Sequence, residues 1–279
     1  MNLTSLKLFI KYLLPPFILL LIKRKTNSLP IYNTYEAAML DAEGYEDNIL
    51  TKVIVAKGKK FSLKVKEQRE VDLMSLRIFM GVSSVFNSKK LTVVDFGGAA
   101  GVHYYTAKSL MPKDVVIDWR VVETTQMVKE AREQGLETSE LKFYDSVESA
   151  VKKEKINLVF ASGSVHCVAN PYKTLEELIN IDAENLVITR TPITDFPRVL
   201  LQHSSLRGNG IGEIPKELGI KDKKISYPAT MMDKSKVEKI LSRYGNIILR
   251  IQEDKAAYVS KDKSYNLWGY VVNKTDEIN

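Results

Sequence analysis

An acidic residue followed by a glycine-rich turn is the feature of this sequence with the clearest chemical potential. Residues 93–103 read VVDFGGAAGVH, in which two β-branched residues lead to Asp95 and then to Gly97, Gly98 and Gly101. Glycines at a strand-to-helix turn let a ligand approach the backbone, and the N-terminus of the following helix attracts negative charge. The stretch therefore predicts a binding site for a nucleotide-type cofactor.

The spacing of these glycines disfavours two common cofactor turns. A dinucleotide turn has glycines at its first, third and sixth positions. Counted from Gly97, the two later positions hold Ala99 and Val102, and counted from Phe96 the first glycine is missing. The sequence also lacks the phosphate loop G-x-x-x-x-G-K-[ST].

The turn resembles the first motif of class I S-adenosylmethionine-dependent methyltransferases. It reads Asp95-x-Gly97-x-Ala99-x-Gly101, with Ala99 in place of the middle glycine. This resemblance implies S-adenosylmethionine as the cofactor, with a zwitterionic amino acid where a dinucleotide has its pyrophosphate. Asp95 would meet the ammonium group, directly or through water, and the helix N-terminus would favour the carboxylate. The bare turn, Gly98 included, would let the cofactor approach the backbone.

Three residues at the ends of later predicted strands extend this cofactor site. Glu123 can accept both hydroxyls of a ribose, which an S-adenosylmethionine site and a dinucleotide site share. Asp145 follows the third strand, where such enzymes place a side chain against the adenine amino group, although it could instead cap the next helix. Ser162 lies in a fourth-strand stretch that resembles methyltransferases acting on small molecules, at the edge facing the transferred methyl group.

Candidates for the acceptor side of the reaction are few, because the chain has three histidines. A hydroxyl acceptor loses its proton as the new bond forms, so a general base helps. We rank His166 first, His203 second and His103 third, each with a structural hydrogen bond as the alternative. Arg190 could hold an anionic acceptor such as a phosphate or uronate, or form an ion pair. Neither the scattered histidines nor the single Cys167 predicts a metal site.

The elements that would position these residues follow from a change in hydrophobic period. Short apolar runs alternate with helical patterns from residue 91, which predicts an α/β fold with a Rossmann-like, doubly wound, mostly parallel seven-stranded sheet. A terminal antiparallel hairpin would complete it, and Asp233 would cap the helix before that hairpin. The predicted strands are 91–96, 115–123, 141–144, 156–161, 186–189, 246–251 and 266–272.

The chain divides into three predicted regions. Residues 1–30 are an apolar and basic segment with a linker, residues 31–90 a helical lead-in, and residues 91–279 the methyltransferase-like domain. Within the lead-in, Lys57–Lys66 is predicted to be an exposed basic connection between helices. An irregular insertion at 192–232, which contains His203, is expected to cover the active site.

The net charge of +7 arises mostly at the N-terminus. Residues 1–35 hold five basic residues and no acid, so the rest of the chain carries only +2, which argues against a nucleic-acid partner. The uncharged run Tyr12–Ile22 has 11 residues and includes two prolines, whereas a spanning helix needs about 20 apolar residues. We expect residues 1–25 to lie on an anionic membrane surface; packing on the protein's own core, or a signal or spanning segment, are the alternatives.

More closely, residues 31–274 resemble a bacterial methyltransferase family associated with surface-polysaccharide biosynthesis. The resemblance implies a cytoplasmic enzyme, peripheral to the inner face of the membrane, that O-methylates a sugar of a glycan or its lipid-linked precursor. The alternatives are an NAD-dependent Rossmann oxidoreductase or sugar-nucleotide enzyme, and a non-catalytic, methyltransferase-like binding protein. The stretches that carry the resemblance are Tyr35–Ala38, Gly44-Tyr45, Ile49-Leu50, Asp95–Gly98, Trp119–Glu123, Ala161–Gly163, Thr189–Pro192 and Gln202-His203.

Overall fold

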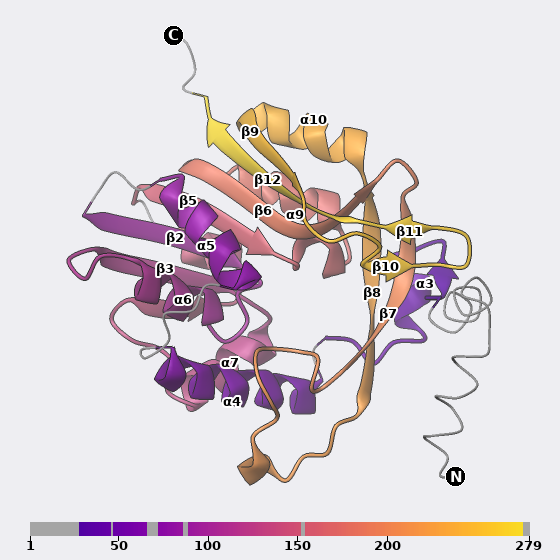
Figure 1. Ribbon diagram of the computed structural model, residues 1–279, viewed down its shortest axis with the longest axis horizontal. Helices are drawn as coiled ribbons and strands as arrows, with labels where there is room; N and C mark the ends of the chain where they lie inside the picture. Colours follow the sequence, from indigo (N-terminus) through magenta and orange to yellow (C-terminus); the bar gives the residue numbers. More distant parts are fainter. Residues whose placement is uncertain (1–27, 46, 66–71, 86–88, 152–153, 276–279) are drawn as a thin grey trace, which may run out of the picture.

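A twisted, mostly parallel sheet forms the centre of the structure, a computed structural model that describes residues 28–45, 47–65, 72–85, 89–151 and 154–275 (Figure 1). Seven of its strands lie in the order β4-β3-β2-β5-β6-β12-β9. The first five are parallel, and β12 is antiparallel to both of its neighbours. This arrangement confirms the predicted fold class, terminal hairpin included. The strands are β2 (Lys90–Phe96), β3 (Val116–Val122), β4 (Leu141–Tyr144), β5 (Ile156–Ser162), β6 (Ala183–Thr194), β9 (Gly245–Gln252) and β12 (Leu267–Lys274).

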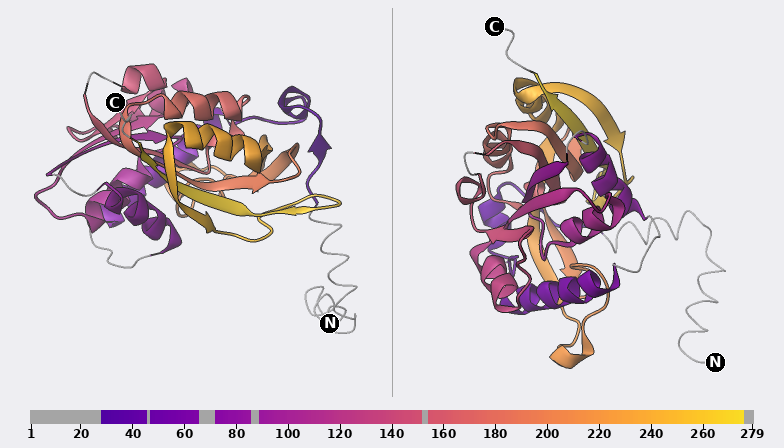
Figure 2. Two further views of the ribbon diagram at one scale, coloured as in Figure 1. Left: turned by 90° about the horizontal axis from the view of Figure 1, so that it is seen from above. Right: turned by 90° about the vertical axis from the view of Figure 1, so that its left-hand side faces the viewer.

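Helices cover both faces of this sheet (Figure 2). One hydrophobic cluster contains side chains from α4 (Asn48–Lys64), α5 (Leu73–Ser83), α6 (Val102–Leu110) and α7 (Thr125–Glu133). The second contains side chains from α8 (Val147–Ala150), α9 (Pro171–Ile179) and α10 (Lys234–Tyr244). The covering helices change face between β2 and β5, and ligands of open α/β sheets bind outside the carboxyl ends of the strands at such a switch point.

Local sequence explains why these elements begin where they do. All seven residues of β5, INLVFAS, are buried, as expected for a central parallel strand covered on both faces. Thr124 caps α7 by accepting a hydrogen bond from Met127 N. Asp233 caps α10 through Lys236 N at 2.9 Å, which confirms the predicted cap.

The expectation of an irregular insertion is wrong, because this segment forms two long strands. Strand β7 (Arg198–Ser205) pairs antiparallel with β8 (Lys224–Asp233) over eight residue pairs, and β8 runs parallel to the last two residues of β6. The run Val199–Leu201 lacks the alternation of polar and apolar residues that marks a half-buried strand, so the pattern hid β7. Short elements complete the fold: β1 (Ile31–Tyr32), α3 (Tyr35–Met39), β10 (Tyr258–Val259) and β11 (Ser264–Tyr265).

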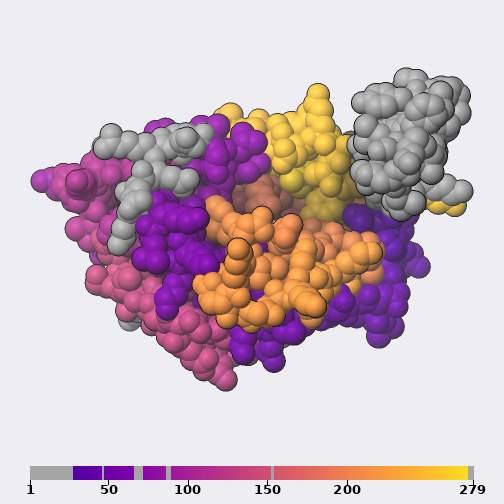
Figure 3. All heavy atoms as spheres, turned by 60° about the horizontal axis from the view of Figure 1, so that its bottom comes forward, coloured from indigo at the N-terminus to yellow at the C-terminus, as the bar shows by residue number. Residues whose placement is uncertain are grey.

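The predicted exposed connection at Lys57–Lys66 is also wrong at its start. Helix α4 continues to Lys64, and the Lys57 side chain is buried. Its ammonium group donates to the carbonyl oxygens of Leu206, Arg207 and Asn209 at 2.9, 2.8 and 2.7 Å. This clamp joins the start of the β7–β8 connection to α4, and Figure 3 shows the orange atoms of that connection against the purple atoms of the lead-in.

The predicted membrane-surface segment, residues 1–25, lies outside the described residues. Within the described part of the chain, no helix has the length and apolar character needed to cross a bilayer.

Candidate functional site

The glycine-rich turn lies at the carboxyl end of β2, beside the switch point of the sheet. Gly97, Ala99 and Gly101 all have left-handed backbones, with φ of 70°, 49° and 73°. A Cβ on Gly97 would lie 2.2 Å from the Cβ of Ser164, so only glycine fits there. Ala99 holds a conformation that costs an L-residue about 1 kcal/mol, which suits a turn built for a close ligand.

Helix α4 rests directly on this turn. A Cβ on Gly58 would lie 2.4 Å from the Cβ of Ala100, so the absence of a side chain at Gly58 allows the close contact. Sequence reasoning missed this role, although a lone glycine inside a helix often marks a packing site. The lead-in therefore covers the predicted cofactor turn.

Asp95 lies beneath the turn and has no exposed surface. Its carboxylate accepts a hydrogen bond from Trp119 Nε1 at 2.9 Å and contacts His103 Nδ1 at 3.0 Å. A Cβ on Gly98 would lie 2.3 Å from Asp95 Oδ2, so the carboxylate also packs under the bare backbone of the turn. Protein groups occupy both sides of this carboxylate, and the predicted contact with a cofactor ammonium group stays a prediction.

Glu123 follows β3 and reaches across to the glycine turn. Its two carboxylate oxygens accept hydrogen bonds from Ala99 N and Thr124 N, both at 3.0 Å. Burial, the largest cause, and the Asp95 charge raise the pKa of Glu123 to about 7, against the lowering effect of the two backbone donors. The carboxyl group thus lies beside the turn, and its predicted contact with a ribose stays a prediction.

The other two predicted cofactor residues differ in exposure. Asp145 is exposed after β4, and Ser146, not Asp145, caps α8 through Ser149 N. This leaves the Asp145 carboxylate with no hydrogen bond or ion pair to any described residue. Ser162 is buried at the end of β5, where it accepts a hydrogen bond from Thr189 Oγ1 at 2.9 Å.

Arg190 interrupts β6 at a β-bulge. Its φ is 54°, and the pairing of β6 with β12 shifts register beside it. Its backbone N–H donates to Glu253 Oε1 at 2.6 Å, while its exposed guanidinium has no ion pair or hydrogen bond with the described residues. Bulges near active sites re-aim side chains, and left-handed non-glycine residues often occur there. The guanidinium thus forms no ion pair within the described residues, and its role toward an anionic acceptor stays a prediction.

His166 lies in a short 3-10 helix, η1 (Val165–Cys167), directly after β5. Its ring is buried, and Nε2 lies 2.9 Å from the Tyr258 hydroxyl. Burial, with the nearby Arg190 charge, lowers the pKa of His166 to about 3. The ring is therefore neutral near pH 7 in this structure.

The other two histidines lie elsewhere. His203 is exposed on β7, and since side chains alternate along a strand it faces away from its neighbour Gln202. His103 contacts Asp95, and its ring packs edge-on to Phe160 with centroids 5.2 Å apart. The structure thus places Arg190 near His166. His203 lies on the face of β7 opposite to Gln202.

Several tyrosines that sequence reasoning did not assign line this region. Burial raises the pKa of Tyr45, the Glu123 charge raises it further, and the Arg190 charge lowers it, so the Tyr45 hydroxyl is within electrostatic reach of both charges. Tyr45 packs edge-on to Tyr227, with centroids 5.5 Å apart. Tyr45 therefore lies near Glu123, on the predicted cofactor side, and near Arg190, on the predicted acceptor side. No short sequence motif marks them, because they come from separate elements.

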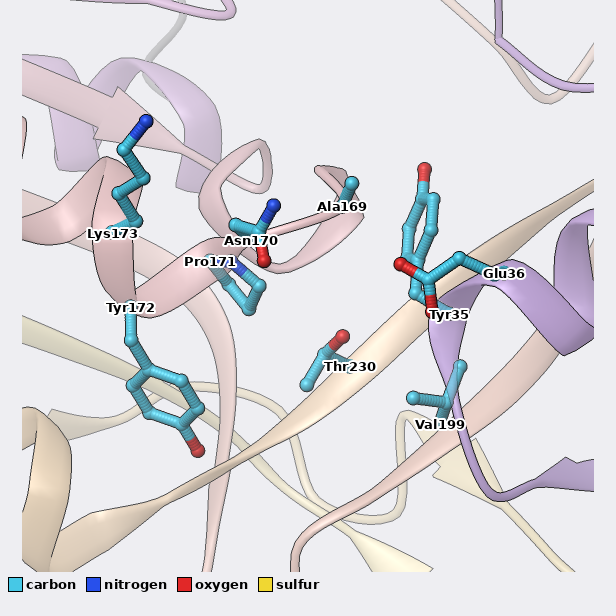
Figure 4. A pocket seen from close by; sticks show the side chains of 9 residues that line it. All are labelled: Tyr35, Glu36, Ala169, Asn170, Pro171, Tyr172, Lys173, Val199 and Thr230. Carbon is cyan, nitrogen blue, oxygen red and sulfur yellow. The ribbon is translucent and has the colours of Figure 1, made fainter.

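No group of three or more histidine, cysteine or acidic side chains is placed to hold a metal ion among the described residues. A pocket of about 290 Å³, lined by none of the predicted site residues, lies between α3, the start of α9 and the β7–β8 sheet (Figure 4). Glu36 and Lys173 bring opposite charges to its lining.

No protein-family model and no curated protein matches this chain. Similar solved structures include a methyltransferase dependent on S-adenosylmethionine from Clostridium acetobutylicum (16% identity, 78% of this chain and 99% of that chain, TM-score 0.46). A second is such a methyltransferase from Aquifex aeolicus (20%, 77% and 98%, TM-score 0.41). A third is the human N-acetylserotonin methyltransferase (13%, 73% and 52%, TM-score 0.41).

Proposed function

We propose that this chain is an S-adenosylmethionine-dependent methyltransferase. The observation that supports it most is the pairing of Glu123 with the turn at Ala99, at the carboxyl ends of β2 and β3. Glu123 would bind the ribose hydroxyls of the cofactor, and Gly97, Ala99 and Gly101 would lie against its methionyl part. When bound, this cofactor supplies an electrophilic methyl group. These residues fit S-adenosylmethionine. Asp95 is the exception, because its carboxylate is buried beneath the glycine turn and hydrogen-bonded to Trp119.

We further propose that the acceptor is a hydroxyl of an acidic sugar in a surface polysaccharide or its lipid-linked precursor, at the cytoplasmic face of the membrane. The unpaired guanidinium of Arg190 supports an anionic acceptor. The apolar and basic composition of residues 1–25 supports the membrane location. The polysaccharide context rests on the family resemblance of the sequence.

Calorimetric titration of the full chain with S-adenosylmethionine and with NAD tests the cofactor. We expect binding of S-adenosylmethionine only, weakened about tenfold or more by Glu123→Ala, since a hydrogen bond to a charged group is worth about 1.5 kcal/mol or more. Glu133→Ala is the matched control, because the Glu133 carboxylate is 57% exposed and its contact with Lys129 is long, at 3.9 Å. Binding of NAD without binding of S-adenosylmethionine would contradict the proposal.

Mass spectrometry of surface glycans from cells with and without the protein tests the acceptor. We expect the glycans of cells that lack the protein to lose one methyl group on an acidic sugar. Identical glycans would contradict the acceptor proposal.

A further inference from the structure

Five polar side chains form a continuous hydrogen-bonded chain from the β7–β8 sheet to His166. It begins at Asn209, whose Nδ2 donates to the carbonyl oxygen of Ser205 at 2.7 Å and to Ser204 Oγ at 3.0 Å. A carbonyl oxygen can only accept, so this contact fixes which side of the Asn209 amide carries the oxygen. That oxygen, Oδ1, accepts a hydrogen bond from the Tyr227 hydroxyl at 3.4 Å.

The donor and acceptor roles of each later side chain follow from the hydrogen bond before it. Because the Tyr227 proton is already donated, the Tyr227 oxygen accepts from Gln202 Nε2 at 3.1 Å. The Gln202 amide is thereby oriented, and its Oε1 accepts from the Tyr258 hydroxyl at 2.8 Å. The Tyr258 oxygen is left as an acceptor, and its neighbour at 2.9 Å is His166 Nε2.

The direction of the chain determines the tautomer of His166. Nε2 must donate to Tyr258, so the single proton of the neutral ring is on Nε2 and Nδ1 keeps its lone pair. Nδ1 is buried and has no hydrogen-bond partner among the described residues. A buried acceptor without a partner costs free energy, which a ligand with a donor group would recover.

The position of this lone pair suggests the ligand. His166 follows β5 at the switch point, and the Arg190 charge is close enough to lower its pKa. Arg190 offers an unpaired guanidinium from the bulge in the neighbouring parallel strand, β6, one residue after its pairing with β5 ends. A ligand that satisfies both groups carries a hydroxyl and, near it, an anionic group.

We infer that this chain of hydrogen bonds holds His166 in its Nε2–H tautomer, so that Nδ1 accepts a hydrogen bond from the hydroxyl group of an anionic methyl acceptor. Tyr258, Gln202 and Asn209 are then positioning residues. The inference rests on the proposed function for the identity of the reaction, and the tautomer itself can be measured without any cofactor.

NMR of protein labelled with ¹⁵N-histidine reads the tautomer directly, since the chain has three histidines. His203→Gln and His103→Gln assign the signals. At pH 7 we expect His166 to be neutral with the proton on Nε2. A proton on Nδ1, or a charged ring, would overturn the inference.

A substitution remote from the ring gives the sharper result. In Gln202→Leu, the Tyr258 hydroxyl loses its acceptor, and its best remaining partner is His166 Nε2 at 2.9 Å. The Tyr258 hydroxyl should then donate to Nε2, so the proton of the neutral His166 ring moves to Nδ1. Adding Tyr258→Phe to Gln202→Leu should abolish this change of tautomer, because the hydroxyl group that would donate to Nε2 is removed. An unchanged tautomer in Gln202→Leu would refute the relay.

Tyr244→Phe is the matched control, because that buried hydroxyl donates to the carbonyl oxygen of Ala183, away from the chain. It should leave the His166 tautomer unchanged, and a changed tautomer would overturn the assignment to this relay. If Gln202→Leu fails to fold, Tyr258→Phe alone serves: it should leave a mixture of the two neutral tautomers, and a pure Nε2–H ring would contradict the relay.

Kinetics then separate the relay from the proposed function. With S-adenosylmethionine and a polysaccharide extract as probes, Gln202→Leu should lower kcat about tenfold or more and leave KM for S-adenosylmethionine within about twofold. An unchanged kcat would overturn the positioning role. Failure of the wild-type protein to bind S-adenosylmethionine would instead refute the proposed function, whatever the tautomer.

Discussion

Protonation of Glu123 should control the binding of adenosine-containing ligands in an accessible pH range. Burial raises the pKa of this carboxyl to about 7, so about one tenth of it is ionised at pH 6 and about nine tenths at pH 8. Ribose hydroxyls donate to the ionised form. Affinity should therefore rise roughly tenfold between pH 6 and pH 8 and level off above that range.

Calorimetry with 5′-methylthioadenosine measures this effect cleanly. The ligand has the ribose hydroxyls and no group that titrates near pH 7, so the pH dependence reports on the protein. Glu123→Gln cannot ionise and should bind with weaker, pH-independent affinity. A flat profile for the wild-type protein, or the same slope in Glu123→Gln, would refute this role of Glu123.

The same pKa predicts a stability effect with a definite sign. Because the folded-state pKa of about 7 exceeds the ordinary glutamate pKa of 4.5, the stabilising effect of the protonated form is lost as pH rises through 7. Between pH 4.5 and pH 8 the wild-type free energy of unfolding should fall relative to that of Glu123→Gln, by up to about 3 kcal/mol. Urea unfolding at several pH values measures the difference, and parallel profiles of the two proteins would contradict it.

Three further outcomes test the parts around the site. Lys57→Met leaves three carbonyl oxygens without their donor, and should lower the free energy of unfolding in urea by about 3 kcal/mol, whereas exposed Lys59→Met should change it little. Gly58→Ala places a Cβ 2.4 Å from Ala100 Cβ and should cost about 1–3 kcal/mol; an equally stable variant would show that α4 can leave the turn. Deletion of residues 1–25 should abolish co-sedimentation with anionic liposomes, and unchanged co-sedimentation would contradict the membrane prediction.

Sequence reasoning predicted the parts of this fold that depend on short-range pattern. The apolar runs at β2, β3 and β5, each followed by a helical pattern, were sufficient to predict a parallel sheet, and the glycine spacing predicted the turn at its switch point. Asp233 was predictable as a cap because its partner is three residues away.

The remaining features depend on contacts between distant residues. The sequence pattern predicts that Lys57 is exposed, because its three carbonyl partners lie in the β7–β8 connection, about 150 positions later. Tyr258 meets His166 across 92 positions, and no local pattern links them. The Arg190 bulge arises where the pairing of β6 with β12 shifts register, which a single strand's sequence does not reveal.

Transfer of a labelled methyl group shows whether this protein is a methyltransferase. The full chain would be incubated with S-adenosylmethionine carrying a trideuterated methyl group and with an acidic polysaccharide extract, and the products analysed by mass spectrometry. We expect one sugar to gain one trideuterated methyl group, and only when wild-type protein is present. Glu123→Ala should form little product, while Glu133→Ala should form as much as wild type. Intact S-adenosylmethionine and unlabelled glycan after incubation with wild-type protein would contradict it.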